Sequence, residues 1–174
     1  MNEAKTLELL QSEAARVRMT ELYGAGHVDE NISRYEELVK KFQENFGEKD
    51  ILMFSSPGRT EISGNHTDHN HGKVLAGSIN LDCVGIAAKN DSSKVNIISE
   101  TFNQKFTIDL NELQPSAKKA GTIDLVKGLL KGFQQSGYEV GGFDAYITSN
   151  VISSAGVSSS ASFEMLLCSM LNRF

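Results

Sequence analysis

The sequence predicts an α+β domain in which a β-rich sheet is backed by helices. The first 48 of the 174 residues carry apolar side chains at helical spacing, whereas the later runs are short and rich in β-branched residues. From there to Phe174, helix-like and strand-like runs are mixed, which is typical of the α+β class. We divide the chain into a helical segment, residues 1–48, and a sheet-containing domain, residues 49–174, which together form a single structural unit.

In the helical segment, Ser33 and Glu36 have the spacing of a capping box and predict the start of a helix. One face of that helix would carry Tyr35, Leu38, Val39, Phe42 and Phe46. Gly47 is a natural stop for it. A looser amphipathic helix is expected upstream, broken by Gly24 and Gly26.

Several strands are expected in the sheet-containing domain. Residues 51–54 form a short apolar strand that leads into a turn at Pro57-Gly58. The apolar runs 84–88 and 95–98 flank the polar residues 90–93, which predicts a hairpin. Alternating residues from Phe102 to Ile108 indicate a further strand, and residues 143–148 another.

Two helices are expected in the same domain. The first covers residues 122–133, with an apolar stripe, and ends near Gly137. The second covers residues 163–171 and is almost wholly apolar.

Composition and charge narrow the function classes. A net charge of −5 argues against a nucleic-acid-binding protein. No apolar run approaches the roughly 18 residues needed to cross a membrane, and the first residues lack the pattern of a signal peptide. Cys83 and Cys168 are far apart, which favours two free thiols in a reducing compartment. We therefore expect a soluble, cytoplasmic protein.

The segment 57–72, PGRTEISGNHTDHNHG, concentrates polar groups in a stretch that offers no apolar face. The Arg59 guanidinium could bind an anion, Asp68 could accept hydrogen bonds from two adjacent hydroxyls, and His66 could donate or accept one. Three alternatives stay open: Arg59 could form a surface ion pair, and Asp68 could bond its own backbone in a turn. His66, His69 and His71 with Asp68 could also bind zinc, although their spacing suits a tetrahedral site poorly.

A second polar segment, residues 150–161, follows a predicted strand and opens the last apolar helix. Its small side chains let a polyphosphate approach the backbone, where free N–H groups and the helix dipole attract negative charge. A serine hydroxyl in the first turn could reach a phosphate-bound Mg²⁺. The alternative is a serine-rich helix cap without a ligand. No Gly-Lys-Ser/Thr occurs, so this is not a Walker loop.

The two segments, in this order, resemble the signatures of galactokinases in the GHMP kinase superfamily. There an arginine precedes a Glu-His-Thr-Asp sugar clamp, and the phosphate loop reads Gly-x-Gly-Leu-Ser-Ser-Ser-Ala. The resemblance implies that Arg59 is catalytic, between the sugar and the γ-phosphate of ATP. It implies a sugar clamp made of Asn65, His66, Thr67 and Asp68. It implies an ATP-binding loop made of Ser154, Ala155, Gly156, Val157, Ser158, Ser159 and Ser160, in which Ser160 also contacts Mg²⁺.

The resemblance also implies the fold and the reaction. The fold would be the GHMP-kinase N-terminal domain (ribosomal protein S5 domain 2-like), a mixed five-stranded sheet with helices on one side. The family's ferredoxin-like C-terminal domain is absent, so residues 49–174 would be incomplete and the missing domain would be their partner. The reaction would be ATP-dependent phosphorylation of the anomeric hydroxyl of a hexose. The family's general base and magnesium-binding carboxylate lie beyond the phosphate loop, so the chain alone is expected to be inactive.

Departures from the family pattern leave two questions open. Asn65 stands where the family has glutamate, so the sugar could be galactose, an amino-sugar relative or another hexose. Ile152, Ser154 and Val157 also differ from the usual loop residues but remain small or apolar. The alternative function is a non-catalytic galactokinase-like sensor that binds sugar and ATP and regulates a partner. The fungal sensor of this family lacks a Ser-Ala pair in its loop, so the pair Ser160-Ala161 favours an enzyme.

Overall fold

A computed structural model describes residues 1–64, 67, 70–115, 121–152 and 156–174. Its helices are α1 (Glu3–Leu10), α2 (Glu13–Tyr23), the short 3-10 helix η1 (Ala25–His27), α3 (Val28–Phe46), α4 (Thr122–Gln135) and α5 (Ser159–Arg173). Its strands are β1 (Leu52–Ser63), β2 (Leu75–Lys89), β3 (Lys94–Ser99), β4 (Gln104–Asp109) and β5 (Phe143–Ser149). Among these described helices, none is both long and apolar enough to cross a bilayer.

Glycines end α2 and α3 where the sequence predicted, but the upstream helix is also broken at Gln11-Ser12, between α1 and α2. Gly24 follows α2 and Gly47 follows α3, with φ angles of 86° and 76° that suit glycine. The predicted capping box at Ser33 is wrong, because α3 already begins at Val28 and Ser33 lies exposed within it. The helical backbone runs without a break from η1 through Ser33. The Ser33 hydroxyl therefore does not lie at a helix end and has no free N–H groups to cap.

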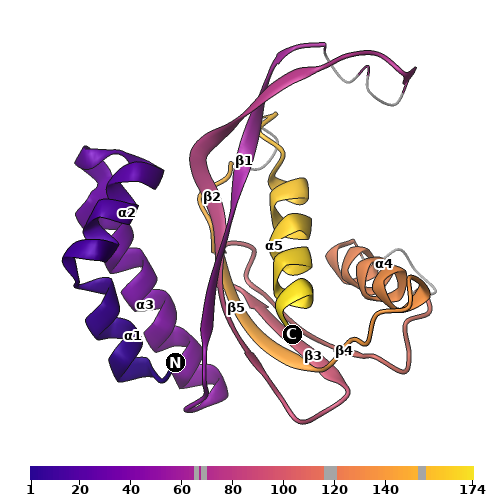
Figure 1. The fold of residues 1–174 in the computed structure, drawn as a ribbon. Coiled ribbons are helices and arrows are strands. Elements are labelled where there is room, and N and C mark those ends of the chain that lie inside the picture. Colours follow the sequence, from indigo (N-terminus) through magenta and orange to yellow (C-terminus); the bar gives the residue numbers. More distant parts are fainter. Residues whose placement is uncertain (65–66, 68–69, 116–120, 153–155) are drawn as a thin grey trace.

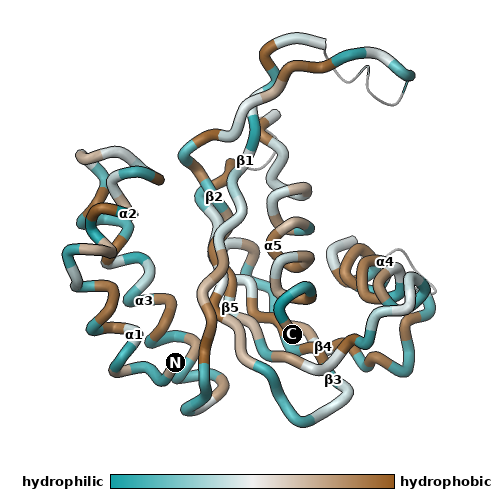
Figure 2. The backbone as a smooth tube through the Cα atoms, viewed as in Figure 1, coloured by the Kyte–Doolittle hydropathy of each residue, from teal (hydrophilic) through white to brown (hydrophobic). Residues whose placement is uncertain are grey.

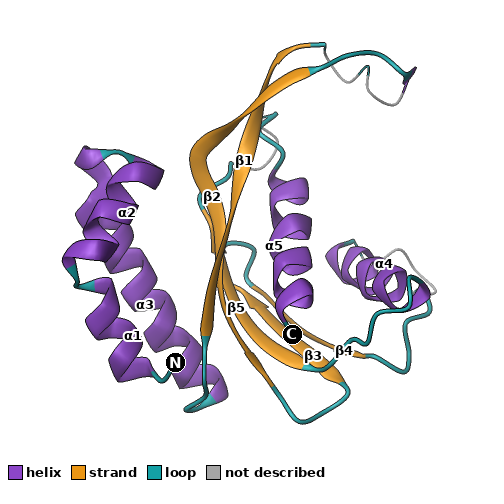
Figure 3. Ribbon diagram, viewed as in Figure 1, coloured by secondary structure: helices purple, strands orange, loops and turns teal. Residues whose placement is uncertain are grey.

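The described strands form one mixed sheet in the order β1-β2-β5-β3-β4 (Figures 1 and 3). Neighbouring strands are antiparallel except for β3 and β5, which are parallel. The predicted hairpin between residues 84–88 and 95–98 is wrong, since β5 lies between the two strands. Most residues of β5 are buried, which requires a central place in the sheet. The turn residues 90–93 are a local signal and carry no information about this insertion of β5.

The central strands are buried on both faces, and hydrophobic residues run along them between two helical layers (Figure 2). Alternate residues of β2 face opposite ways: Val84 and Ile86 pack with α1 to α3, whereas Cys83 and Ala87 pack with α4 and α5. Within residues 49–174, the helices α4 and α5 thus lie on one side of the sheet, as expected. The N-terminal helices cover the other face.

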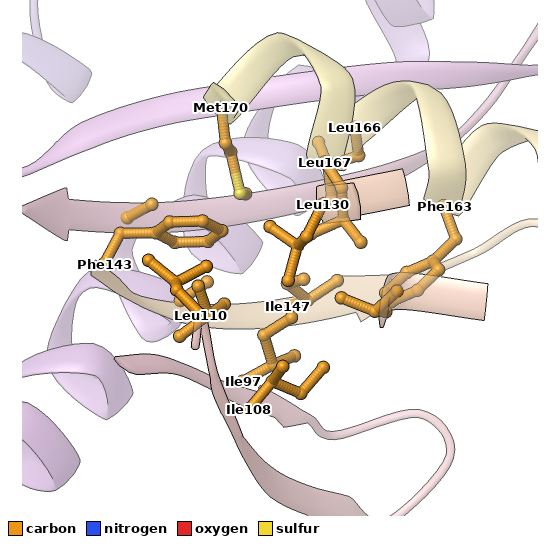
Figure 4. Packing of buried hydrophobic residues seen from close by; sticks show 14 of the residues in the cluster. Ile97, Ile108, Leu110, Leu130, Phe143, Ile147, Phe163, Leu166, Leu167 and Met170 are labelled. Carbon is orange, nitrogen blue, oxygen red and sulfur yellow. The ribbon is translucent and has the colours of Figure 1, made fainter. Parts of the chain in front are cut away.

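Helix α5 is held against the sheet by closely packed apolar side chains. Leu166, Leu167 and Met170 are essentially inaccessible and pack in the same cluster as Phe143 and Ile147 of β5 (Figure 4). Gly85 of β2 leaves room for this contact: a Cβ there would lie 2.6 Å from Met170 Cε and 3.3 Å from Leu166 Cδ2, so the end of the Met170 side chain would have to shift. The apolar core thus holds α5 against the sheet.

Strand β1 runs through Pro57-Gly58, where a turn had been predicted. This is possible because β1 is an edge strand, on which proline's missing N–H costs no ladder bond. Strand β2 pairs with β5 only from Cys83 onward, so residues 59–63 and 75–82 project as a two-stranded ribbon, here called the arm (Figure 1). The polar segment 57–72 thus begins at the base of the arm and continues past its end.

Asp144 of β5 is a buried carboxylate that receives hydrogen bonds from Asn90 and Asn96 and pairs with Lys49. Burial opposes its charged form, but the bonds from Asn96, Lys49 and Asn90 outweigh burial and lower the pKa of this carboxyl below its usual 3.8. A lowered pKa in the folded state stabilises the protein above the unfolded value and loses that effect as pH falls through the folded value.

We therefore expect Asp144→Asn to lower the free energy of unfolding by about 1–3 kcal/mol at pH 7. The difference from the wild type should shrink steadily as pH falls below about 4. Urea unfolding at pH 7 and at pH 3 measures this, with exposed Asp91→Asn as the control, which should change stability by less than about 0.5 kcal/mol. An equal loss at both pH values would contradict the role given to the charge.

Candidate functional site

The two polar segments meet through their backbones. The N–H of Arg59 in β1 donates to the carbonyl oxygen of Val157, at 3.1 Å. A Cβ on the neighbouring Gly58 would lie 2.8 Å from that same oxygen and 3.0 Å from Val151 Cγ1. Glycine is therefore required for β1 to approach the second segment this closely. The structure thus brings together Arg59 and Val157, which lie nearly a hundred positions apart in the sequence.

Helix α5 begins at Ser159, with Ser158 as its N-cap residue. It thus starts in the serine-rich segment predicted to open it, before the predicted apolar run 163–171. Ser158 has φ 64° and ψ 47°, a left-handed conformation that costs a non-glycine residue energy and is enriched at functional sites. The side chain of Ser158 makes no cap hydrogen bond to this helix. A helix start whose first N–H groups are not capped in this way can bind an anion such as a phosphate.

The first turn of α5 is fixed to β1 by a side chain. Ser162 is buried, and its hydroxyl donates to the carbonyl oxygen of Ser56 at 2.7 Å. Ser56 lies three residues before Arg59 in β1. The two bonds therefore hold β1 against Val157, just before α5, and against Ser162, at the end of the first turn of α5. The serine-rich run therefore contributes more than a helix cap.

A hollow of about 430 Å³ opens beside the same helix start. Its lining comprises Ser99, Phe102, Thr122, Leu125, Ser159, Ser160 and Phe163. It lies between the first turns of α4 and α5 and combines apolar surface with hydroxyl groups, which suits a flat, partly polar ligand. Sequence reasoning assigned Phe102 to a strand, but β4 begins at Gln104 and Phe102 is half exposed at this hollow.

A larger hollow, about 570 Å³, lies at the other end of the sheet. It is lined by both chain ends together with residues such as Lys49 and Lys89. None of the described residues predicted for the functional site borders it. Size alone therefore does not identify the site.

Of the residues predicted to form a sugar clamp, the structure describes only Thr67. Its carbonyl oxygen accepts from Asn70 N at 3.1 Å and Gly72 N at 2.7 Å, and its own N–H donates to Gly64 O at 3.2 Å. These bonds connect Thr67, which is exposed, to described residues on both sides of it in the sequence.

The other predicted clamp residues and part of the predicted phosphate loop fall outside the described part of the chain: Asn65, His66, Asp68, Ser154 and Ala155. The zinc alternative also depends on residues outside it, since His66, Asp68 and His69 are not described. Among the residues that are described, no group of three metal-binding side chains occurs.

Behind the site lies a buried polar network that sequence reasoning missed. The Asp82 carboxylate accepts from the hydroxyls of Tyr23 and Ser55, both at 2.5 Å, and from Arg34 Nη1 at 2.7 Å. Burial, followed by the nearby Asp82 charge, raises the pKa of Tyr35, whose hydroxyl lies 2.9 Å from that of Tyr23. No local pattern could reveal this network, because its members are spread from α2 to β2.

The two cysteines are free, as expected. Cys83 is buried, and burial raises the pKa of its thiol to about 12. Cys168 is only partly buried. Because the thiolate is the reactive form, Cys83 is unsuited to catalysis.

Known proteins and a family model match this chain. A family model described as the galactokinase galactose-binding signature matches residues 40–89. Galactokinase of Clostridium tetani is 38% identical over 136 residues, which cover 78% of this chain and 34% of that protein. Galactokinase of Pyrococcus furiosus is 42% identical over 122 residues, covering 70% and 33%. The chain thus spans about a third of the length of these relatives.

Solved structures give the same result for the fold. The crystal structure of Lactococcus lactis galactokinase complexed with galactose aligns with a TM-score of 0.72 and 33% identity, over 80% of this chain and 38% of that one. Methanococcus jannaschii mevalonate kinase aligns with a TM-score of 0.57 and 18% identity, over 72% and 40%, a likeness that shows the fold alone. By sequence and by fold, the chain is therefore similar to the N-terminal part of galactokinases, within the wider fold of the GHMP kinases, as the two polar segments predicted.

Proposed function

We propose that this chain is part of an ATP-dependent sugar kinase that phosphorylates the anomeric hydroxyl of galactose or a related hexose. The observation that supports this most directly is the Arg59–Val157 contact. Phosphoryl transfer depends on positioning and on stabilisation of negative charge. A sugar-side segment that touches a phosphate-side segment is the arrangement that such a transfer needs.

In this proposal each described group has a definite task. The guanidinium of Arg59, which is exposed, stabilises charge on the transferring phosphoryl group. The N–H groups of the α5 first turn bind phosphate oxygens. The hollow beside Phe102 and Leu125 receives the nucleotide base. The remaining parts of the loop, Ser154 and Ala155, would complete the phosphate cradle.

Sugar recognition is assigned to Asn65, His66, Thr67 and Asp68. A carboxylate such as Asp68 accepts hydrogen bonds from two adjacent sugar hydroxyls, and the imidazole of His66 donates or accepts one. Asn65 is neutral where relatives of this signature carry glutamate, so it is the position at which the chosen hexose would be decided.

Mg²⁺ fits the donor set available at the α5 start. Ser160 is exposed in the first turn of α5, and its neutral oxygen is a ligand type that this ion accepts. Mg²⁺ takes its other oxygens from phosphates and water, and when bound it neutralises phosphate charge. Ser160 would hold one position of that shell.

We further propose that the galactokinase-like second domain completes the site, that the protein works in the cytoplasm, and that this chain alone does not turn over. A missing general base typically costs 10²-fold or more in rate.

Nuclear magnetic resonance titration of the 174-residue chain tests the ligand assignments. Mg·ATP should shift the amide resonances of Val157 to Ser160, and galactose should shift those of Arg59 and Thr67. Galactose-dependent release of ADP should be absent. ATP-induced shifts confined to Lys49 and Lys89 at the other hollow, or steady turnover by the chain alone, would contradict the proposal.

Gly58 provides a test of the backbone contact. Gly58→Ala places a Cβ 2.8 Å from Val157 O, so the loop must move, and we expect a loss of about 1–3 kcal/mol in stability together with weaker Mg·ATP binding. Gly77→Ala in the arm is the matched control, because its Cβ would meet nothing nearer than 4.0 Å. Calorimetric titration and urea unfolding measure both variants. Equal behaviour of the two would show that the close approach does not position the loop.

A further inference from the structure

The buried network around Asp82 has a feature that stability alone does not explain. The backbone carbonyl oxygen of Asp82, not only its carboxylate, is bonded: it accepts from Arg34 Nη2 at 3.1 Å and from Asn150 N at 3.0 Å. Asn150 is the first residue after β5 and begins the segment that leads to the phosphate loop. One residue thus connects α3 with the start of that loop.

The same residue marks the point where β2 leaves its regular pairing. Pro57 of β1 pairs with Asp82, but Arg59 pairs with Ser78. One residue of β1, Gly58, therefore faces three of β2, residues 79–81, and the strand is bulged there. Bulges bend a strand and redirect the residues beyond them, and this bulge lies where the arm departs from the sheet. Asp82 is the residue of β2 at which regular pairing with β1 resumes toward the sheet.

A carboxylate at this place needs several partners. Asp82 is 3% exposed, and burying a charge is costly unless it is paired and hydrogen-bonded. Its three side-chain donors come from α2, α3 and β1, namely Tyr23, Arg34 and Ser55. Arg34 binds both the carboxylate and the carbonyl of Asp82, a two-pronged contact that its planar fork favours. The network thereby ties three elements to one point of β2.

From these contacts we propose that Asp82 is a positioning residue for the phosphate loop and for Arg59. The carbonyl oxygen of Asp82 binds the N–H of Asn150. Its carboxylate binds Ser55 and its backbone pairs with Pro57, which fixes β1 just before Gly58 and Arg59. Val151, next to Asn150, in turn packs against Gly58. The name phosphate loop rests on the proposed function, whereas the positioning itself is a property of the fold.

Residue-resolved amide hydrogen exchange tests this on the unliganded 174-residue chain. Asp82→Asn removes the charge that Arg34 and Tyr23 bind while keeping the side-chain shape. The amides of Arg59 and Asn150 should then exchange at least about tenfold faster, since bonds to charged groups are the stronger ones. The amide of Asn90, bonded to Gly142 O at the other end of the sheet, should change much less.

Asp144→Asn is the matched control, because Asp144 is likewise a buried, paired sheet carboxylate. It should show the reverse pattern, with faster exchange at Asn90 and little change at Arg59 and Asn150. Tyr23→Phe, which removes a single donor, should give a smaller increase at the same two amides and serves if Asp82→Asn does not fold. Uniform acceleration in Asp82→Asn, or unchanged exchange at Arg59 and Asn150, would overturn the proposal.

A nucleotide titration separates this inference from the proposed function. Weaker Mg·ATP binding by Asp82→Asn than by Asp144→Asn would add support to the positioning role. Absence of Mg·ATP binding by the wild-type chain would count against the proposed function. The exchange pattern would still decide whether Asp82 positions the two segments.

Discussion

The site depends on the close approach of two backbones, that of β1 at Gly58 and Arg59 and that of the segment before α5 at Val157. The approach is possible only because position 58 has no side chain, and an N–H to carbonyl bond of 3.1 Å connects the two backbones. Neither segment could place a sugar-binding group near a phosphate-binding group by itself. Everything we propose about chemistry depends on this contact.

The rest of the fold keeps the two backbones in place. Strand β5 is inserted between β2 and β3, so its end delivers the loop beside β1 rather than at the far edge of the sheet. On one face α5 is fixed by packing on Gly85 and by the Ser162–Ser56 bond. On the other face the N-terminal helices reach the same region through Arg34 and Asp82. The core and the site are therefore built from the same contacts.

The sequence could predict what local patterns encode. The apolar stripe of α4, the opening of α5 in the serine-rich segment and the glycine stop at Gly47 were all predictable from spacing and turn chemistry. The insertion of β5 could not be predicted, because strand order depends on burial from distant segments rather than on the turn at residues 90–93. The strand through Pro57 depends on its edge position, and the Asp82 network joins side chains far apart in the chain. The roles of Asn65, His66 and Asp68 rest on the resemblance and remain predictions.

The Arg59–Val157 hydrogen bond can be measured directly in solution. Nuclear magnetic resonance detects scalar coupling across a hydrogen bond, between the amide nitrogen of the donor and the carbonyl carbon of the acceptor. Our account predicts a resolved coupling between Arg59 N and the Val157 carbonyl carbon in the unliganded chain, with slow exchange of the Arg59 amide. No coupling, together with exchange of the Arg59 amide as fast as in an unstructured peptide, would contradict it.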